Sequence, residues 1–354
     1  MIFLGDIAIP PNVFPDHCAA TRRLFESKTV AANLEGALIR DGEPLLERQV
    51  LFNDESRTLA YLEQNNIKLV SLANNHMLDV SENVAYTIRT LRSRGIRSCG
   101  AGACLDEAMS PAVVADGAND LLFLAFGWEV IGCKAATEKS PGACPLTPKV
   151  VLDAIRQARE RHPGRRIVLF MHWNYELELY PQPMHRQLAF AAVDAGADGV
   201  IGCHSHCVQG FETYRGAPIV YGLGNWFLPH GVFFGGRLKY PDICLKQLAF
   251  EWDLDQNRFR LHWFRYDPKS HRIDWEKTED AEQSEEMNRL SPFRAMSHDR
   301  YIAWFGKNRR KKALLPVYKK MSTPAVNRLK DIWVRQRQNG IRWLYDLKLK
   351  GGAK

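Results

Sequence analysis

The sequence predicts an α/β fold with a largely parallel central sheet, because short apolar runs alternate with helix-like stretches through residues 1–230. The composition is that of a globular protein, since 45% of the 354 residues are hydrophobic and 25% are charged. A hairpin-like pair of apolar stretches, at 247–253 and 259–264, follows the alternating part. Antiparallel strands at that point indicate a mixed sheet or a second sheet.

The predicted strands are short apolar runs, and the predicted helices lie between them. The strands span residues 2–4, 29–33, 67–72, 121–126, 167–171, 199–201 and 219–223. The helices span 81–94, 148–161 and 184–195. Ser81 suits the N-cap of the first helix, and Gly95 and Gly196 suit helix ends. Right-handed strand–helix–strand crossovers then bring the carboxyl ends of successive strands to one edge.

The basic charge of the chain is concentrated in its tail. The formal net charge is +8, but residues 307–354 hold 15 basic and 2 acidic residues, so the tail carries +13 and the rest −5. We therefore expect a body at 1–275 and a basic helical C-terminal extension at 276–354. Mixed basic and large apolar residues are typical of segments that lie on anionic membranes. A helical extension docked on the acidic body is the alternative, and nucleic acid is disfavoured because no recognised binding fold accompanies the charge.

Several features bear on location. The eight cysteines are scattered without the paired spacing of a zinc site, which favours free thiols in a reducing compartment. No apolar run approaches the ~20 residues that span a bilayer. The first residues do not resemble a signal peptide. These features predict a protein of the cytoplasm, or one held peripherally on the cytoplasmic membrane.

Side chains that can bind metals recur just after the predicted strands. They are Asp6, Glu35, Asn75, His172, and the pair His204 and His206. Ligands bind open α/β sheets outside the carboxyl ends of the strands, so these groups should converge. Imidazoles with carboxylate and amide oxygens suit manganese, iron or zinc. Each motif alone also fits a turn or a loop, but their shared position at strand ends favours one site.

The sequence allows either one or two metal ions. The two histidines of His204-x-His206, in a locally extended segment, would point to the same side and contact one metal or two neighbours. Two ions ~4 Å apart would bind both the attacking water and the leaving oxygen of a phosphoester, with Glu35 as the bridging carboxylate.

An ordered set of motifs carries a resemblance to a known family. The set is Gly5-Asp6, Asn33-Leu34-Glu35, Leu72-Ala73-Asn74-Asn75-His76-x-x-Asp79, His172-Trp173-x-x-Glu176, Gly202-x-His204-x-His206 and Tyr221-x-Leu223-Gly224-Asn225. Over residues 1–228 it resembles the CapA family of capsule and poly-γ-glutamate synthesis proteins, which is related to the calcineurin-like metallophosphoesterases. The resemblance implies a calcineurin-like four-layer αββα sandwich with a centre for one or two divalent metal ions.

The resemblance also implies a role for each matching residue. Asp6, Glu35, Asn75, His172, His204 and His206 would be the metal ligands. His76 would protonate a leaving oxygen or hold the phosphoryl group, with Asp79 as its orienting partner. Glu176, Arg186 and Asn225 would line the site, and Arg186 suits bidentate binding of a carboxylate or phosphate.

The sequence departs from the family pattern in three places. Calcineurin-like enzymes usually carry a histidine two residues after the first aspartate, and here that residue is Ala8. Glu35 stands where many relatives have aspartate, and Asn174 stands where glycine is usual. One metal position therefore has one ligand fewer, which leaves single-metal occupancy open. Many CapA proteins are also membrane-anchored, whereas this sequence shows no such segment.

Two functions fit this interpretation. The first is a metal-dependent hydrolase of a phosphoester or amide-type bond that serves synthesis or remodelling of an extracellular polymer. The second is a non-catalytic assembly or export factor that binds an acidic polymer through the same metal pocket. The glycine-rich segment 231–236 fits either an ordinary loop or a lid near the site.

Overall fold

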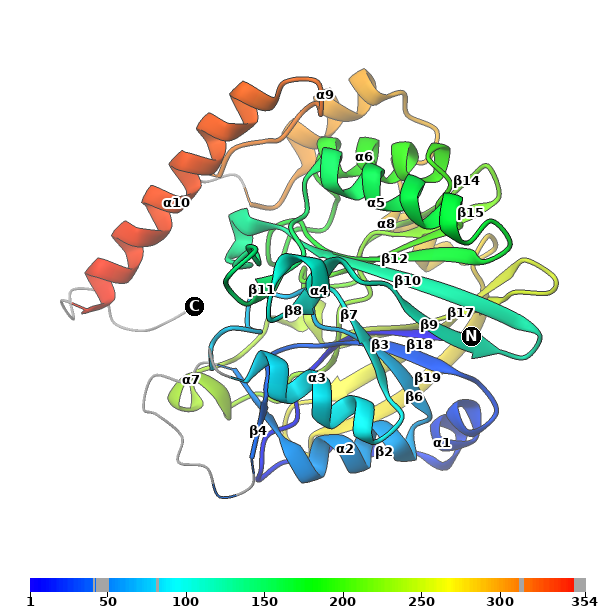
Figure 1. Ribbon diagram of the computed structural model, residues 1–354. Coiled ribbons are helices and arrows are strands. Elements are labelled where there is room, and N and C mark those ends of the chain that lie inside the picture. The colour runs from blue at the N-terminus through cyan, green and yellow to red at the C-terminus, as the bar shows by residue number, and fades with distance from the viewer. Residues whose placement is uncertain (41, 43–50, 81–82, 312–314, 347–354) are drawn as a thin grey trace.

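Two β-sheets pack face to face and carry helices on their outer faces (Figure 1). The computed structural model describes residues 1–40, 42, 51–80, 83–311 and 315–346. Within them, the first sheet runs β2 (Asp16–His17), β19 (Arg272–Asp280), β18 (Arg258–Asp267), β17 (Lys246–Asp253), β1 (Ile2–Ile7), β3 (Val30–Leu34), β6 (Ile67–Ser71) and β7 (Arg97–Cys99), with β16 (Asn225–Phe227) also paired to β1. The second runs β14 (Phe211–Tyr214), β15 (Ala217–Val220), β13 (Gly199–Cys203), β12 (Arg166–His172), β10 (Asn119–Gly127) and β9 (Ala112–Asp116).

Helices and short strands complete the architecture. Two small sheets pair β4 (Leu38–Ile39) with β5 (Asn53–Asp54), and β8 (Ala101–Gly102) with β11 (Gly142–Ala143). The helices are α1 (Ala19–Glu26), α2 (Glu55–Gln64), α3 (Val84–Ser93), α4 (Leu105–Met109), α5 (Pro148–Arg161), α6 (Pro183–Asp194), α7 (Phe233–Gly236), α8 (Glu285–Leu290), α9 (His298–Asn308) and α10 (Pro324–Asp346), with 3-10 turns η1 (Glu129–Ile131) and η2 (Asp242–Cys244). The expected α/β class, with two sheets and flanking helices, is confirmed.

The central core lies between the two sheets. Phe3 of β1 contacts Phe123 of β10, Phe170 of β12 and Phe250 of β17, with ring centroids 6.4, 6.1 and 6.2 Å apart. All four side chains are buried. The two sheets are therefore held together by interdigitated aromatic and aliphatic side chains, as in other face-to-face sheet packings.

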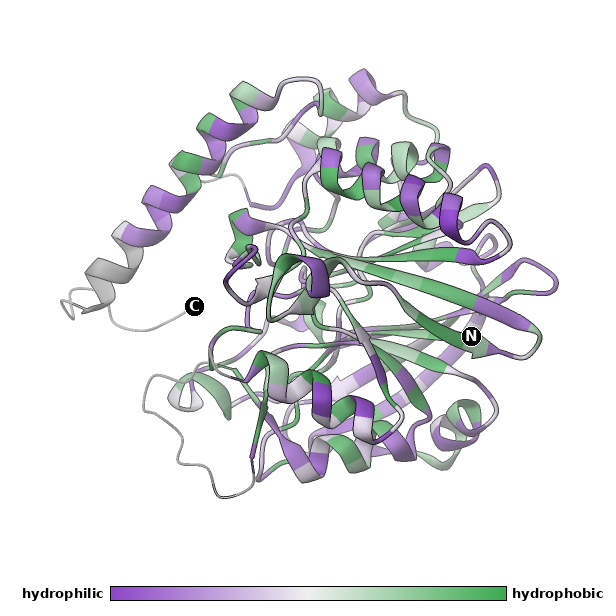
Figure 2. Ribbon diagram, viewed as in Figure 1, coloured by the Kyte–Doolittle hydropathy of each residue, from purple (hydrophilic) through white to green (hydrophobic). Residues whose placement is uncertain are grey.

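Each outer face has its own apolar core beneath amphipathic helices. In α5, Thr147 caps the first turn by accepting a hydrogen bond from the Val150 amide, and Pro148 suits the first helical position. Val151 and Ile155 then bury one stripe of that helix against the second sheet. Figure 2 shows the same pattern generally, with hydrophilic and hydrophobic residues alternating along the helices and mostly hydrophobic residues along the central strands.

Two predicted elements differ from the structure. The strand expected at 219–223 is β15 at Ala217–Val220, because the chain leaves the ladder after Val220 and makes only a bridge from Leu223 to Val208. The helix expected from Ser81 begins in the structure at Val84, and Ser81 and Glu82 lie outside the described residues. Most of the other predicted strands have both ends within two residues of an observed strand, but β1 and β18 each run three residues further than predicted.

The C-terminal part is partly built into the body. The boundary expected at 275/276 falls inside β19, which continues to Asp280. Among the described residues beyond it, five side chains are buried in the core that includes α6, namely Phe293 before α9, Tyr301 and Phe305 of α9, Tyr318 of the following segment, and Val334 of α10. Parts of the predicted basic tail, at 312–314 and 347–354, lie outside the described residues. Among the helices that are described, none combines the length and apolar character needed to cross a membrane.

Candidate metal centre

The parallel strands of both sheets end at the same edge of the sandwich, and the predicted site residues lie there. Asp6 is near the end of β1, and its Cα pairs with that of Asn33 on β3 and that of Asn225 on β16. Gly5 allows this crowding, because a Cβ at that position would lie 1.8 Å from the Gly224 carbonyl oxygen. On the second sheet, His172 ends β12 and pairs with Cys203 of β13.

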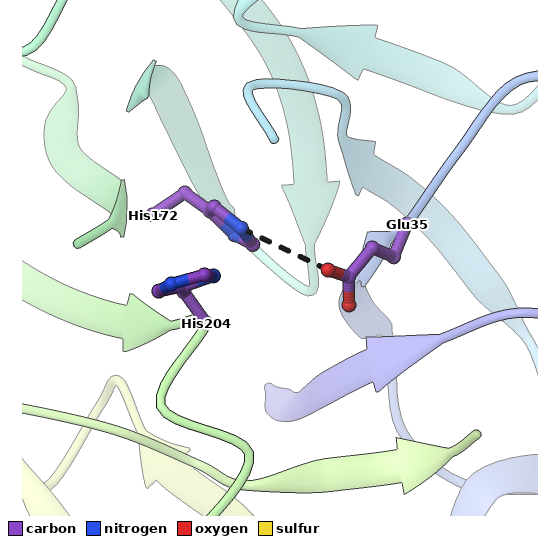
Figure 3. Close-up of side chains that lie close together, drawn as sticks. All are labelled: Glu35, His172 and His204. Atoms are coloured by element: carbon purple, nitrogen blue, oxygen red, sulfur yellow. Dashed lines mark ion pairs between the residues drawn. The ribbon is translucent and has the colours of Figure 1, made fainter. Parts of the chain in front are cut away.

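A first group of metal-binding side chains contains Glu35, His172 and His204, which we call the histidine-rich group. Their ligand atoms lie within 4.8 Å of one another, and all three residues are buried. Figure 3 shows His172 and Glu35 pointing toward each other, with Nε2 of the histidine 3.9 Å from the carboxylate and the His204 ring beside it. Asn75 adds an amide oxygen 2.7 Å from Nε2 of His172. Four donors from four separate chain segments thus converge on one point.

A second group contains Asp6, Glu35 and His206, again within 4.8 Å, and we call it the carboxylate-rich group. Glu35 belongs to both groups, as expected of a bridging carboxylate. Nδ1 of His206 lies 3.5 Å from Asp6 and 2.8 Å from the Asn225 side-chain oxygen. Ala8 is buried among apolar side chains and adds no ligand, so the carboxylate-rich group has three donors of this kind.

The backbone of the His204-x-His206 loop differs from the extended segment that the sequence suggested. His204 has φ 85° and His206 has φ 56°, so both lie in the left-handed region that few residues other than glycine adopt. The two rings therefore enter different groups, His204 the histidine-rich one and His206 the carboxylate-rich one. The expected extended segment was therefore wrong, but the two rings still lie close together, with centroids 5.6 Å apart, and enter neighbouring groups that share Glu35, which is one of the two arrangements expected.

Burial is the largest influence on the pKa values of the acidic side chains and of His172 in the site. Burial raises the pKa of Glu35 well above its ordinary value, and the charges of Asp6, Glu176 and Asp79 raise it further. Burial also raises the pKa of Asp6, against the opposing effect of His206. For His172 burial lowers the pKa well below its ordinary value, which favours the neutral, metal-binding imidazole.

The donor set fits a borderline divalent metal ion. Among the residues that the structure describes, neither oxygen of Glu35 has a hydrogen-bond partner, and the Nδ1 atom of His172 has none either. Buried polar atoms are normally bonded, so a buried carboxylate without a partner fits a site that binds a cation. Imidazole, carboxylate and amide donors are those that manganese, iron and zinc accept. A cation would also reverse the unfavourable burial of Asp6 and Glu35.

His76 lies beside the donors, and it is partly exposed. Its Nδ1 is 2.7 Å from Asp79, and its Nε2 is 3.9 Å from Glu35. The Asp79 carboxylate also accepts a hydrogen bond from the Leu51 amide at 3.2 Å. The Asn74 side-chain oxygen accepts one from the His76 amide, which fixes the turn that presents the ring. This geometry agrees with an oriented imidazole at the mouth of the site.

The remaining predicted residues have different placements. Glu176 is close enough for its charge to act on Glu35. Asn225 orients His206 as described above. Arg186 needs a correction, because its guanidinium forms a buried ion pair with Glu212 at 2.6 Å and donates to the carbonyls of Phe293 and Met296. Its donors are committed to the fold, so we withdraw the expectation that it binds a substrate anion.

Several residues of the site had no role assigned from the sequence. Asn33, the first residue of the Asn33-Leu34-Glu35 motif, donates to Asp6 at 2.8 Å. Tyr240 packs on His206 with ring centroids 4.7 Å apart, and Phe234 meets the His76 ring edge-on at 6.3 Å. Phe234 lies in α7, so the segment 231–236 borders the site at that residue, and its interpretation as a lid stays a prediction.

Comparison with known proteins identifies relatives over the same region. The family model for the bacterial capsule synthesis protein PGA_cap matches residues 6–229. The capsule biosynthesis protein CapA of Bacillus anthracis is 28% identical over 63% of this chain and 55% of its own length. The PGA biosynthesis protein CapA of Bacillus subtilis is 27% identical over 62% and 57%. A probable polyglutamine synthesis accessory protein of Mycobacterium tuberculosis is 31% identical over 54% and 53%. The chain thus spans little more than half the length of these relatives.

Among solved structures, a 5′-nucleotidase precursor from Thermus thermophilus aligns with 78% of this chain and 52% of its own, at 12% identity and a TM-score of 0.41. An NAD nucleotidase from Haemophilus influenzae aligns with 73% and 41%, at 10% identity and a TM-score of 0.36. The family match covers most of the chain and every predicted metal ligand. The chain therefore belongs to the bacterial capsule synthesis protein family PGA_cap.

Proposed function

We propose that this protein is a metal-dependent hydrolase that cleaves a phosphoester or related bond during synthesis of an anionic capsule polymer. The observation that carries the proposal is the His76–Asp79 pair, at 2.7 Å, beside a buried set of metal donors. A protein that only held a metal or a polymer would not need an oriented imidazole at the mouth of the pocket. The family and its relatives supply the polymer context.

Each residue of the site would have a separate role in binding or proton transfer. Asn75, Glu35, His172 and His204 would hold one divalent ion, and Asp6, Glu35 and His206 would hold a second. When bound, such ions supply Lewis-acid activation of water and of the scissile group. His76 would donate a proton to the leaving oxygen, with Asp79 holding the ring in the required orientation. Tyr240 and Phe234 cover the rings of His206 and His76 and limit access of bulk water.

Turnover of an aryl phosphate ester with added manganese tests this function. We expect His76→Ala to lower kcat by about 10²–10⁴-fold while metal content is unchanged, because the variant loses proton transfer but no ligand. His162→Ala, at a partly exposed position just past the end of α5, is the matched control and should keep the wild-type rate. Equal rates in wild type and His76→Ala would remove His76 from the mechanism.

The non-catalytic assembly factor is the second candidate, and Ala8 is the observation that favours it. The carboxylate-rich group lacks the additional imidazole expected at that position, so it would bind its ion less tightly than a four-donor site. Elemental analysis and phosphoester turnover, measured together, distinguish the hydrolase from the assembly factor. Polymer binding with one ion per chain and no hydrolysis of any phosphoester tested would favour the assembly factor.

We also propose that α10 rests on an anionic membrane surface. Val326, Leu329, Ile332 and Trp333 are 48, 68, 49 and 53% exposed, and their spacing places them along one side of the helix. Arg328 and Arg335 are exposed on the same helix. A basic helix with an exposed apolar stripe suits the interface of an anionic bilayer, where each basic residue contributes ~1 kcal/mol.

Flotation with phosphatidylserine-containing vesicles tests the membrane proposal. We expect low-salt binding that high salt releases and that Leu329→Ser with Trp333→Ser abolishes. Trp275→Ser removes an aromatic side chain that is 46% exposed on β19 and serves as the control. Truncation is a poor test, because Tyr301, Phe305 and Tyr318 belong to the core. Equal flotation of wild type and the α10 variant, or none, would contradict the proposal.

A further inference from the structure

The C-terminal segment 309–311 is fastened to the body by one buried carboxylate. Glu178, in the loop that follows β12, is 0% exposed. Its two oxygens accept hydrogen bonds from the amides of Arg310 and Lys311 at 2.8 and 3.0 Å. Arg309 turns inward, packs over Phe305 and approaches the same carboxylate to 3.9 Å. A backbone held in this way fixes where the next two cationic side chains begin.

The same residue is tied to the loop that carries the metal histidines. The Glu178 carbonyl accepts hydrogen bonds from the Gln209 side chain at 2.7 Å and from the Cys207 thiol at 3.3 Å. The amide of Leu177 donates to the Ser205 carbonyl at 2.8 Å. Ser205 and Cys207 are the immediate neighbours of His206. Glu178 therefore links the basic segment to the metal centre through two short connections.

Arg310 and Lys311 lie close to the loop of the metal histidines, because both bond through their amides to Glu178. Burial raises the pKa of the Cys244 thiol, and among the nearby charges Arg310 and Lys311 lower it while Glu176 raises it. Glu176 in turn acts on Glu35, the carboxylate shared by both metal groups. Arg310 is exposed and Lys311 half-buried, so neither charge is enclosed in the core. The geometry agrees with this placement, because the amides of Arg310 and Lys311 bond to Glu178, and Glu178 bonds to Cys207 beside His206.

We propose that Arg310 and Lys311 form a cationic subsite for the anionic groups of the polymer, beside the metal centre and positioned by Glu178. The proposal rests on the proposed function for its anionic polymer, and it specifies a polymer of repeated carboxylates. The body without the tail carries −5 and would repel such a chain, whereas the tail carries +13. Part of that charge would then attract the polymer to the site.

Equilibrium binding to fluorescent poly-γ-glutamate, with the manganese-loaded full chain, tests the subsite without requiring turnover. We expect Arg310→Gln with Lys311→Gln to raise Kd about tenfold and to weaken the salt dependence. The control, Lys319→Gln with Arg328→Gln, removes the same charge from exposed positions elsewhere in the tail and should change Kd less than about twofold. An equal loss in both pairs, or no loss, overturns the subsite. If the wild type hydrolyses no phosphoester but the two double variants still differ in Kd as expected, only the proposed hydrolase activity is overturned.

A second polymer probe and a variant of Glu178 test the subsite further. Inorganic polyphosphate replaces poly-γ-glutamate as the probe, and a loss confined to polyphosphate would overturn the assignment to a carboxylate polymer. Glu178→Gln keeps both cations but weakens the support of their backbone, so we expect Kd to rise about threefold. In the Arg310→Gln, Lys311→Gln background the same change should have no further effect. A full additional loss there would show that Glu178 acts only on the fold.

Discussion

Buried carboxylates occur both at the metal edge and elsewhere in this molecule, and their surroundings differ. Glu212 is buried against Arg186 at 2.6 Å and also accepts a hydrogen bond from Tyr221. Glu251 is bonded to His262 at 2.9 Å and paired with Lys28 at 3.1 Å. Within the described part of the chain, Glu35 has no hydrogen-bond donor for either oxygen.

The presence or absence of a bonded partner distinguishes buried carboxylates that stabilise the fold from those that bind a ligand. A buried ion costs several kcal/mol unless a partner compensates it. Glu212 and Glu251 receive that compensation from their own chain, so removing them should destabilise the protein. Glu35 does not receive it, so the protein retains an energetic cost that only a bound cation relieves.

The largest expected effect is at Glu212. Glu212→Gln leaves the Arg186 guanidinium buried without its counter-charge, which should lower the free energy of unfolding by about 3–5 kcal/mol. Urea denaturation measures it, with metal content as a check that the site survives. The exposed pair of Arg215 and Asp194 gives the contrast, since Asp194→Asn should cost no more than about 1 kcal/mol. If Glu212→Gln lowers the free energy of unfolding as little as Asp194→Asn does, the buried pair contributes no more to stability than the exposed pair.

Glu35 should respond in the opposite direction. In metal-free protein, Glu35→Gln replaces an uncompensated buried carboxylate with a neutral amide, and we expect the unfolding free energy to rise by about 1–3 kcal/mol. Chelation should lower the melting temperature of the wild type and leave that of the variant unchanged, because the variant has lost the ligand shared by both groups. If the wild type has the same melting temperature with and without chelator, the result would argue against a metal site.

The comparison also explains which parts of the site the sequence could predict. Asp6, Asn75 and His172 follow strand-like runs, and the topology of parallel strands brings their ends together whatever the details of packing. The His76–Asp79 pair is three residues apart, so local turn geometry is enough to join it. Such predictions depend only on strand order and short spacing.

Other features depend on contacts between residues that are distant in sequence, and the sequence pattern could not predict these contacts. Arg186 resembles a phosphate ligand until its partner is known, and Glu212 lies 26 residues later on β14. Phe234 of α7 and Tyr240 of the segment after it reach the site without a metal-binding motif. The left-handed backbone of His204 and His206 is equally invisible, because neither residue is a glycine that would signal it.

The smallest expected effect concerns Glu251, and it can be tested through pH. The hydrogen bond from His262 and the contact with Lys28 lower the pKa of Glu251 from its ordinary 4.5 to about 2, against the cost of burial. A carboxyl with a lowered folded pKa stabilises the protein fully above its unfolded value and loses that contribution as pH falls from about 4.5 toward 2. We expect Glu251→Gln to cost about 1–2 kcal/mol near neutral pH, measured by urea denaturation, and less as the pH falls below about 4.5. Metal should not alter this difference, because Glu251 lies on β17 and outside both donor groups. A gap between wild type and variant that stays constant with pH would mean that packing at Glu251, and not its charge, contributes the stability.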